Sequence, residues 1–395
     1  MNMTDYQIKK EQKQPVRQKE KETKKLVSWI LIVVMCVIFA ILIYRCNHFE
    51  RKSLTSTEGQ SYEKGEVVSI VKDNLAEDGQ RYGQQEVIVR MKTGSLKGKE
   101  VNATSPSGTL FGADCTKGMK VIVLLSTSQD TNVATIYSQD RTIPIVVFLT
   151  FFVLVVCSIG GMKGVKAILG LAITVIGIFG IFLPLIYRGI SPVLTAIVVC
   201  LVATVISLVL LGGICKKTVS AIVGTTIGVT ISGLAALTFG KIAGISGYNV
   251  SDIETLSFVA QNCSIKIGEL LFAGIIISSL GAVMDVGMSI SSTIQEIHET
   301  DPSLSGKQLF LSGIHVGRDM MGTMTNTLIL AYAGGSVTTL FINYAYKLSA
   351  NQLLNSYNIG IEIMQGISGS LGIVLTVPVT AFIASFLLKN KKTQQ

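Results

Sequence analysis

The chain has 395 residues, of which 49% are hydrophobic and 15% are charged, and its mean hydropathy is +0.53. A soluble domain of ordinary composition has roughly a quarter of its residues charged, so this composition excludes a purely soluble protein. The net charge of +9 does not indicate nucleic-acid binding, because residues 1–25 hold eight basic against four acidic residues and three lysines follow residue 388. Basic clusters beside long uncharged runs are instead the topology signals of a membrane protein.

Cysteine usage excludes two kinds of site. The seven cysteines are scattered, no two of them form a C-x-x-C pair, and the chain has only three histidines. We therefore expect no zinc or other metal site, no disulfide framework and no cofactor.

The first apolar run, residues 26–44, follows a basic tail at residues 1–25. Its 19 residues are long enough for a membrane anchor, and no small-residue cleavage site follows it. We predict an uncleaved transmembrane anchor with the basic tail in the cytoplasm.

Residues 50–141 are polar and contain short β-branched runs, such as residues 65–71, 86–91 and 119–125, between turn residues. With two shorter runs they predict about five strands and a small all-β barrel of OB or SH3-like type. An OB barrel often binds oligonucleotides, but central aromatic residues are few here, so a spacer or protein-contact domain is the favoured interpretation.

The rest of the chain is nearly continuous membrane. Hydrophobic runs predict a seven-helix domain at residues 143–388, which makes eight spans with the anchor. Lysine clusters fall in alternate connections, so both termini, including residues 389–395, are expected in the cytoplasm and the β domain outside the plasma membrane. The predicted spans after the anchor are residues 143–159, 167–187, 191–213, 218–239, 269–290, 322–346 and 361–388.

Glycine is frequent inside these spans, and three G-x-x-x-G pairs begin at Gly160, Gly224 and Gly240. We interpret these pairs as sites of close helix packing, with a hinge or pore role as the alternative. The connection at residues 242–268 is too long for a tight turn and predicts a capping or re-entrant segment.

Two neighbouring helices carry polar side chains at helical spacing. Asp285, Ser289 and Ser292 are four and three residues apart, which places them on one helical face. Asp319 and Asn326 continue a similar pattern on the next helix. The candidate transport or polar-cluster residues are Asp285, Ser289, Ser292, His315, Arg318, Asp319, Thr323 and Asn326.

The depth of the two aspartates follows from helix geometry. Counted from Glu269, Asp285 lies about 24 Å along the helix, in the cytoplasmic third of a ~30 Å hydrocarbon core. Residues 308–346 exceed one straight span, so we predict that their first part lies along the inner membrane surface or that the helix breaks near Gly317 or Gly322. In either case we expect Asp319 near the depth of Asp285.

A carboxylate inside a membrane is costly unless it is paired or hydrated, so these residues are functional-site candidates. Two interpretations stay open: Arg318 neutralises Asp285 or Asp319 in a structural clamp, or the aspartates bind a transported ion, proton or solute.

Three functions are compatible with these features: a secondary transporter or channel, a membrane scaffold for envelope assembly or export that acts through the β domain, and an intramembrane hydrolase with an aspartate dyad. Walker A, H-E-x-x-H and G-x-S-x-G motifs are missing from the sequence, which favours a protein that is not an enzyme. As partners we expect the lipid bilayer and a second copy or another membrane protein, but no nucleic acid.

Residues 281–290, GAVMDVGMSI, and residues 317–334, GRDMMGTMTNTLILAYAG, resemble the signature stretches of the bacterial YibE/F membrane protein family. The order of an anchor, a small β domain and a multi-span region is also similar. The resemblance implies a bacterial cytoplasmic-membrane protein, and it implies no particular activity.

Overall fold

The computed structural model describes residues 30, 33–49, 54, 59–75, 82–106, 112–128 and 131–389. The predicted basic tail, most of residues 26–32 of the predicted anchor, and residues 390–395 of the C-terminal tail lie outside these described residues. The chain divides into two compact units. One is Ser53–Ser158, and the other combines Met1–Lys52 with Ile159–Gln395.

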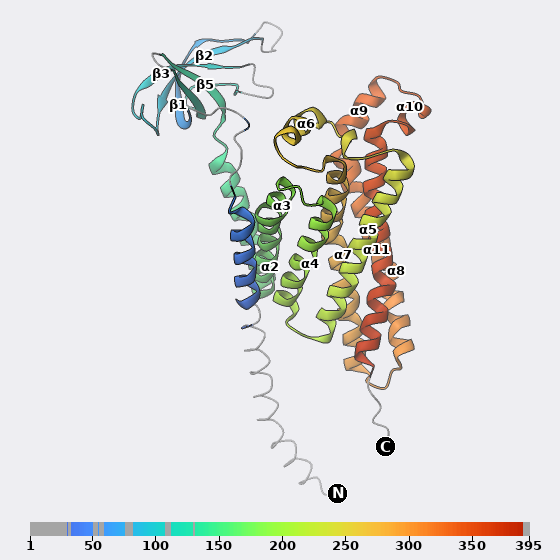
Figure 1. Ribbon diagram of the computed structural model, residues 1–395. Coiled ribbons are helices and arrows are strands. Elements are labelled where there is room, and N and C mark those ends of the chain that lie inside the picture. The colour runs from blue at the N-terminus through green and yellow to red at the C-terminus, as the bar shows by residue number, and fades with distance from the viewer. Residues whose placement is uncertain are drawn as a thin grey trace, which may run out of the picture. The chain divides into compact units, whose positions relative to one another are not determined.

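The first unit contains a closed five-stranded barrel, as predicted (Figure 1). Side chains alternate inward and outward along the strands, and inward residues such as Val89, Val123 and Ile136 are fully buried. The strand order is β1-β2-β3-β5-β4, with β4 closing on β1 and β3 pairing parallel to β5, which is the OB rather than the SH3-like type. The elements are β1 (Gln60–Lys72), β2 (Gln85–Met91), β3 (Glu100–Ser105), β4 (Lys120–Ser128) and β5 (Thr131–Gln139), followed by α2 (Thr142–Gly177).

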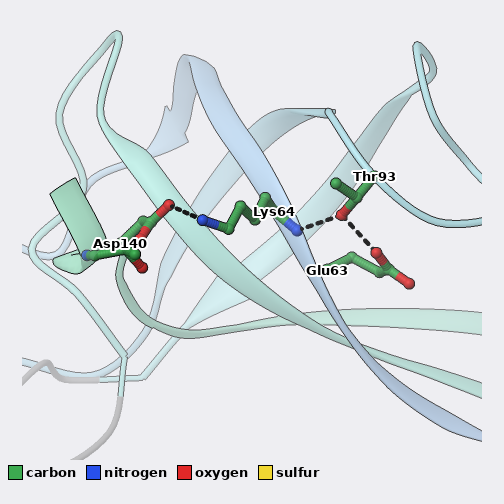
Figure 2. Close-up of polar contacts among 5 residues, drawn as sticks. Glu63, Lys64, Thr93 and Asp140 are labelled. Atoms are coloured by element: carbon green, nitrogen blue, oxygen red, sulfur yellow. Dashed lines mark hydrogen bonds and ion pairs between the residues drawn. The ribbon is translucent and has the colours of Figure 1, made fainter. Parts of the chain in front are cut away.

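A polar network ties the end of β5 to β1 where α2 begins, as Figure 2 shows. The Asp140 carboxylate accepts a hydrogen bond from the Thr142 backbone N–H at 3.0 Å and pairs with Lys64 Nζ at 3.0 Å. The Lys64 backbone N–H donates to Thr93 Oγ1 at 2.8 Å, and the Thr93 hydroxyl donates to Glu63 at 2.5 Å. Hydrogen bonds from Thr142, and then the Lys64 ammonium, lower the pKa of Asp140 to about 2. The network therefore fixes how the chain leaves the barrel.

The second unit is helical. Within it, α11 packs against α5, α7 and α8, and α7 packs against α4 (Figure 1). Its elements are the helix Val33–Asn47, the end of α2, η1 (Ile178–Phe182), α3 (Leu183–Tyr187), α4 (Pro192–Gly212), α5 (Lys216–Ala243), η2 (Gly247–Asn249), α6 (Ile253–Asn262), α7 (Ile267–Thr300), α8 (Gly306–Gly335), α9 (Val337–Ala345), α10 (Ala350–Leu354) and α11 (Tyr357–Leu388).

Within the described residues, five helices are long and apolar enough to cross a membrane, or six if the bent pair of α8 and α9 is one span. The helix Val33–Asn47, at the predicted anchor, is apolar but shorter in the part of the chain that the structure describes. The five helices are Thr142–Tyr187, Pro192–Gly212, Lys216–Ala243, Ile267–Thr300 and Tyr357–Leu388.

The structure differs from the sequence prediction at two places where a helix was expected to end or break. The predicted spans 143–159 and 167–187 lie in one helical run, Thr142–Tyr187, which is interrupted only locally at Gly161 (φ 53°, ψ −136°), a conformation that glycine tolerates best. The prediction of a break near Gly317 or Gly322 was wrong, because α8 is continuous and the 59° bend follows it, at Ser336. Gly317 serves packing instead.

The Gly224 and Gly228 pair confirms the predicted close packing, whereas nothing lies within 4 Å of the β-carbon positions of Gly160 and Gly244 in the other two pairs. A β-carbon at Gly224 would overlap the Thr380 hydroxyl of α11, and one at Gly228 would overlap the Thr376 hydroxyl. The two backbones therefore approach each other as closely as small residues allow.

The connections divide between two ends of the helical unit. The α7–α8 turn meets the end of α11, because a β-carbon at Gly306 would lie 3.5 Å from the Lys389 side chain. The α4–α5 turn lies at this same end, whereas α6, α9 and α10 lie at the other (Figure 1). Lys216, Lys217 and Lys307 consequently share one end with Lys389.

Candidate functional site

The candidate residues of α8 occupy one face of that helix, and this face points away from the bundle. Leu309, Gly313 and Gly317 lie on the opposite face and are buried against α7 and α11. The candidate residues of α8 are all exposed in the single chain: His315, Arg318, Asp319, Thr323 and Asn326.

The candidate residues of α7 divide by exposure. Asp285 is exposed and continues an outward row with Gly274, Ser278 and Gly281, in steps of four, three and four residues. Ser289 and Ser292 are half-buried at the flank of this row.

The two outward faces adjoin each other. The Ser278 and Tyr332 hydroxyls form a hydrogen bond between α7 and α8. The helices run antiparallel, and the position of Gly317 against Ile290 places Asp319 close to the level of Asp285. The expected similar depth of the two aspartates is therefore supported.

Contacts with α11 show the level along the bundle at which these charges lie. A β-carbon at Gly313 would lie 3.0 Å from Ala381, and one at Gly317 would overlap Val377. Residues 363–388 of α11 are uncharged, and Val377 stands near the middle of this run. Arg318 and Asp319 consequently lie level with the centre of an apolar segment that is long enough to span a bilayer, and Asp285, close to their level, lies nearer this centre than the predicted cytoplasmic third.

The predicted clamp does not form within one chain. Among the described residues, Arg318 makes no ion pair with Asp285 or Asp319, and the two carboxylates share no hydrogen bond. The Thr323 hydroxyl donates to the Met320 carbonyl at 3.0 Å, a bond within its own helix. The charges of the set thus face outward without a partner in the part of the chain that the structure describes.

The candidate residues lie outside a small pocket of the helical unit and form no metal site in the part of the chain that the structure describes. A small pocket between α4, α5 and α7 is lined mainly by apolar side chains and by none of the candidate residues. No three His, Cys, Asp or Glu side chains of the described ranges lie close enough to hold a metal ion.

A buried set of hydroxyls escaped the sequence predictions. The side-chain oxygens of these residues lie where α5, α7 and α11 meet and have no hydrogen-bond partner among the described residues. A sequence signal could have found them: serine and threonine residues at helical spacing that lie opposite glycines on a facing helix. The residues are Thr225, Ser232, Ser291 and Thr380.

Long apolar helices with extensive exposed apolar surface, together with a separate small barrel, define a helical membrane protein. Residues 148–390 match the model of the YibE/F-like protein family, so the chain belongs to this family, as the resemblance of its two segments indicated. No curated protein and no solved structure matches the chain.

Proposed function

We propose that this protein is a non-catalytic multi-pass protein of the bacterial plasma membrane that conducts or transports a cation along the polar faces of α7 and α8. One observation carries the proposal: Asp285 and Asp319 face outward without partners, beside the centre of an uncharged α11 run. Even if Arg318 neutralises one carboxylate, the other remains at membrane depth, where such a group typically belongs to an ion or proton pathway.

The proposed topology has eight spans. Four spans are the helices α4, α5, α7 and α11, a fifth is the anchor, and a sixth is the α8–α9 pair. The break at Gly161 divides Thr142–Tyr187 into the remaining two. The grouping of Lys216, Lys217, Lys307 and Lys389 at one end supports a cytoplasmic position for that end and for both termini. The barrel is then exofacial.

The test is cation current in proteoliposomes. Purified protein is reconstituted and placed in turn under Na⁺, K⁺ and proton gradients, and charge movement is recorded on a solid-supported membrane. We expect a current above that of empty liposomes with at least one cation. Asp319→Asn should abolish it, and Asp285→Asn should abolish it or shift its pH dependence.

Thermal stability in detergent separates a transport residue from a structural one. If Asp285 or Asp319 binds the transported cation without an ion-pair partner, its Asn variant keeps the wild-type unfolding midpoint, since neutralising an unpaired charge at membrane depth costs little. If one of them instead pairs with an Arg318 side chain, its Asn variant strands that arginine at a cost of roughly 3–5 kcal/mol, and the midpoint of that variant falls. No current with any of the three cations, or full current in both variants, contradicts the proposal.

A scaffold function is the second candidate, because the barrel forms a compact unit of its own and exposes the edge-to-face ring pair of Tyr62 and Tyr137. Exposed aromatic residues are frequent at protein-binding surfaces. A scaffold predicts the opposite phenotype pattern: a chromosomal Tyr62→Ser allele impairs growth or envelope integrity, whereas the two Asp→Asn alleles behave as wild type.

A further inference from the structure

The outward face of α8 presents two opposite charges level with the middle of an apolar segment. Arg318 and Asp319 are exposed, and neither has an ion-pair partner in the described chain. Lipid contact is costly for both groups. Residues 142–158, the most apolar part of α2, carry no charge that could neutralise them.

We propose that this face binds the same face of a second copy of the chain, so that two α8 helices pair about a two-fold axis normal to the membrane. Such an axis keeps every residue at its own depth in both copies. Arg318 and Asp319 are adjacent and differ in height by only about 1.5 Å, so Arg318 of one copy reaches the level of Asp319 of the other.

The positions of the two charges around the helix fit this symmetry. Successive helical residues are about 100° apart, which places Arg318 on one side of the face and Asp319 on the other. A two-fold rotation exchanges the sides, so each Arg318 meets the Asp319 of the partner copy. The pair therefore forms twice, and both charges of each chain are neutralised.

The midline between the charges suits close approach of two identical helices. His315, Gly322 and Asn326 lie along it, and a β-carbon at Gly322 would meet nothing within 4 Å. A glycine at this position lets the two backbones come near each other. The Asn326 amide is both donor and acceptor, so two copies can hydrogen-bond across the axis.

The inference rests on the membrane placement of α8 in the proposed function, but not on transport. The pairing gives the charged face a protein environment, which the single chain lacks. It also fixes the partner as a second copy, because the face carries equal and opposite charges that complement each other.

The first test is disulfide crosslinking in native membranes. Gly322→Cys places a thiol on the midline, and Leu375→Cys places one on an exposed part of α11 near the same level. With copper–phenanthroline, Gly322→Cys should give a disulfide-linked dimer roughly tenfold above Leu375→Cys, because a disulfide requires α-carbons within about 7 Å. The unsubstituted chain, with its seven cysteines, supplies the background.

The second test exchanges the charges. Two differently tagged copies are co-expressed, and recovery of the second tag with the first is measured in lipid nanodiscs. Arg318→Asp alone and Asp319→Arg alone should each lower recovery by roughly tenfold, because like charges then face each other. The double exchange restores the cross-pairs and should return recovery to within about twofold of wild type. Thermal midpoints of all variants show that they are folded.

Three results would overturn the inference: a Gly322→Cys adduct with a different protein, equal crosslinking at Leu375→Cys, or failure of the double exchange to restore association in a folded protein. A monomer that carries cation current would exclude the pairing and leave the proposed function intact. A dimer without current would exclude the proposed function and leave the pairing intact.

Discussion

Asp140 links the barrel to the helix that follows it. Its carboxylate accepts the backbone N–H of Thr142, the first residue of α2, and pairs with the Lys64 ammonium, and its side chain is only 7% exposed. We predict that Asp140→Asn destabilises the barrel by roughly 0.5–1 kcal/mol, because the amide oxygen still accepts the Thr142 N–H but the ion pair with Lys64 is lost. The thermal midpoint of β structure, followed by circular dichroism in detergent, measures this loss.

The pH dependence of this interaction has a defined sign. The pKa of Asp140 is lowered from 3.8 to about 2 in the folded protein, so its contribution to stability is complete above the ordinary pKa and disappears as the pH falls from about 4 to 2. Wild type and Asp140→Asn should therefore differ at pH 6 and converge near pH 2. A difference that persists unchanged to pH 2 would exclude the carboxylate as its cause.

The candidate site shows what residue patterns can and cannot predict. Helical spacing correctly grouped Asp319 and Asn326 on one face of α8 and placed Asp319 near the level of Asp285. It could not show that the face points outward. In water a polar face points to solvent, whereas in a membrane it points to the bundle interior, and periodicity is the same in both cases.

Among the helices, the α5–α11 contact has the least spare room. We predict that Gly228→Ala lowers stability by about 1–3 kcal/mol, because the added methyl group would overlap the Thr376 hydroxyl and come within 2.8 Å of Val283. Gly281→Ala is the matched control, since nothing lies within 4 Å of its β-carbon position. Thermal unfolding in detergent compares the two variants, and equal midpoints would contradict the close contact.

The break in α2 depends on a single residue. Gly161 has φ 53° and ψ −136°, and a side chain there costs of order 1–3 kcal/mol. Gly161→Ala should therefore reduce stability or straighten the helix, whereas Gly160→Ala, with open space at its β-carbon position, should be neutral. Abundance in membranes and the thermal midpoint provide the readouts. Unaltered behaviour of Gly161→Ala would show that the break is not required.

Element boundaries were largely predictable, and the exceptions have physical causes. The five strands followed from β-branched runs, and α4, α5, α7 and α11 followed from uncharged stretches. The continuity of α8 through Gly317 and Gly322 was not predictable, because glycine is compatible with both a break and a close packing contact. The contact with Val377 decides between these, and it comes from another helix.

The sidedness of the whole chain can be tested on the barrel. The barrel contains Cys115, but its side chain is fully buried in the barrel core, so a label cannot reach it in the folded domain. Ser95 lies in an exposed turn, and Ser95→Cys should react with an impermeant maleimide in intact cells if the barrel is exofacial. The unsubstituted chain is the control. Labelling only after the cells are broken would reverse the proposed orientation.

Whole-molecule architecture was predictable where composition changes sharply, at the barrel and at the long apolar helices. The number of spans depends on features that composition does not encode, namely the local conformation of Gly161 and the 59° bend at Ser336. A twenty-residue apolar run shows that a helix is long enough to span, but not where it turns.

Because Cys115 is buried, the reactivity of its thiol reports how often the barrel opens. Its backbone N–H donates to Gln85 Oε1 at 2.9 Å, and Gln85 Nε2 donates back to the Cys115 carbonyl at 3.1 Å, so this part of the chain is held inside the folded barrel. A thiol reagent can reach this sulfur only when the barrel opens, so the modification rate divided by that of a free thiol reports the opening equilibrium in the intact protein. The same residue that cannot report sidedness thus measures how often the domain comes apart while its helices stay in the membrane.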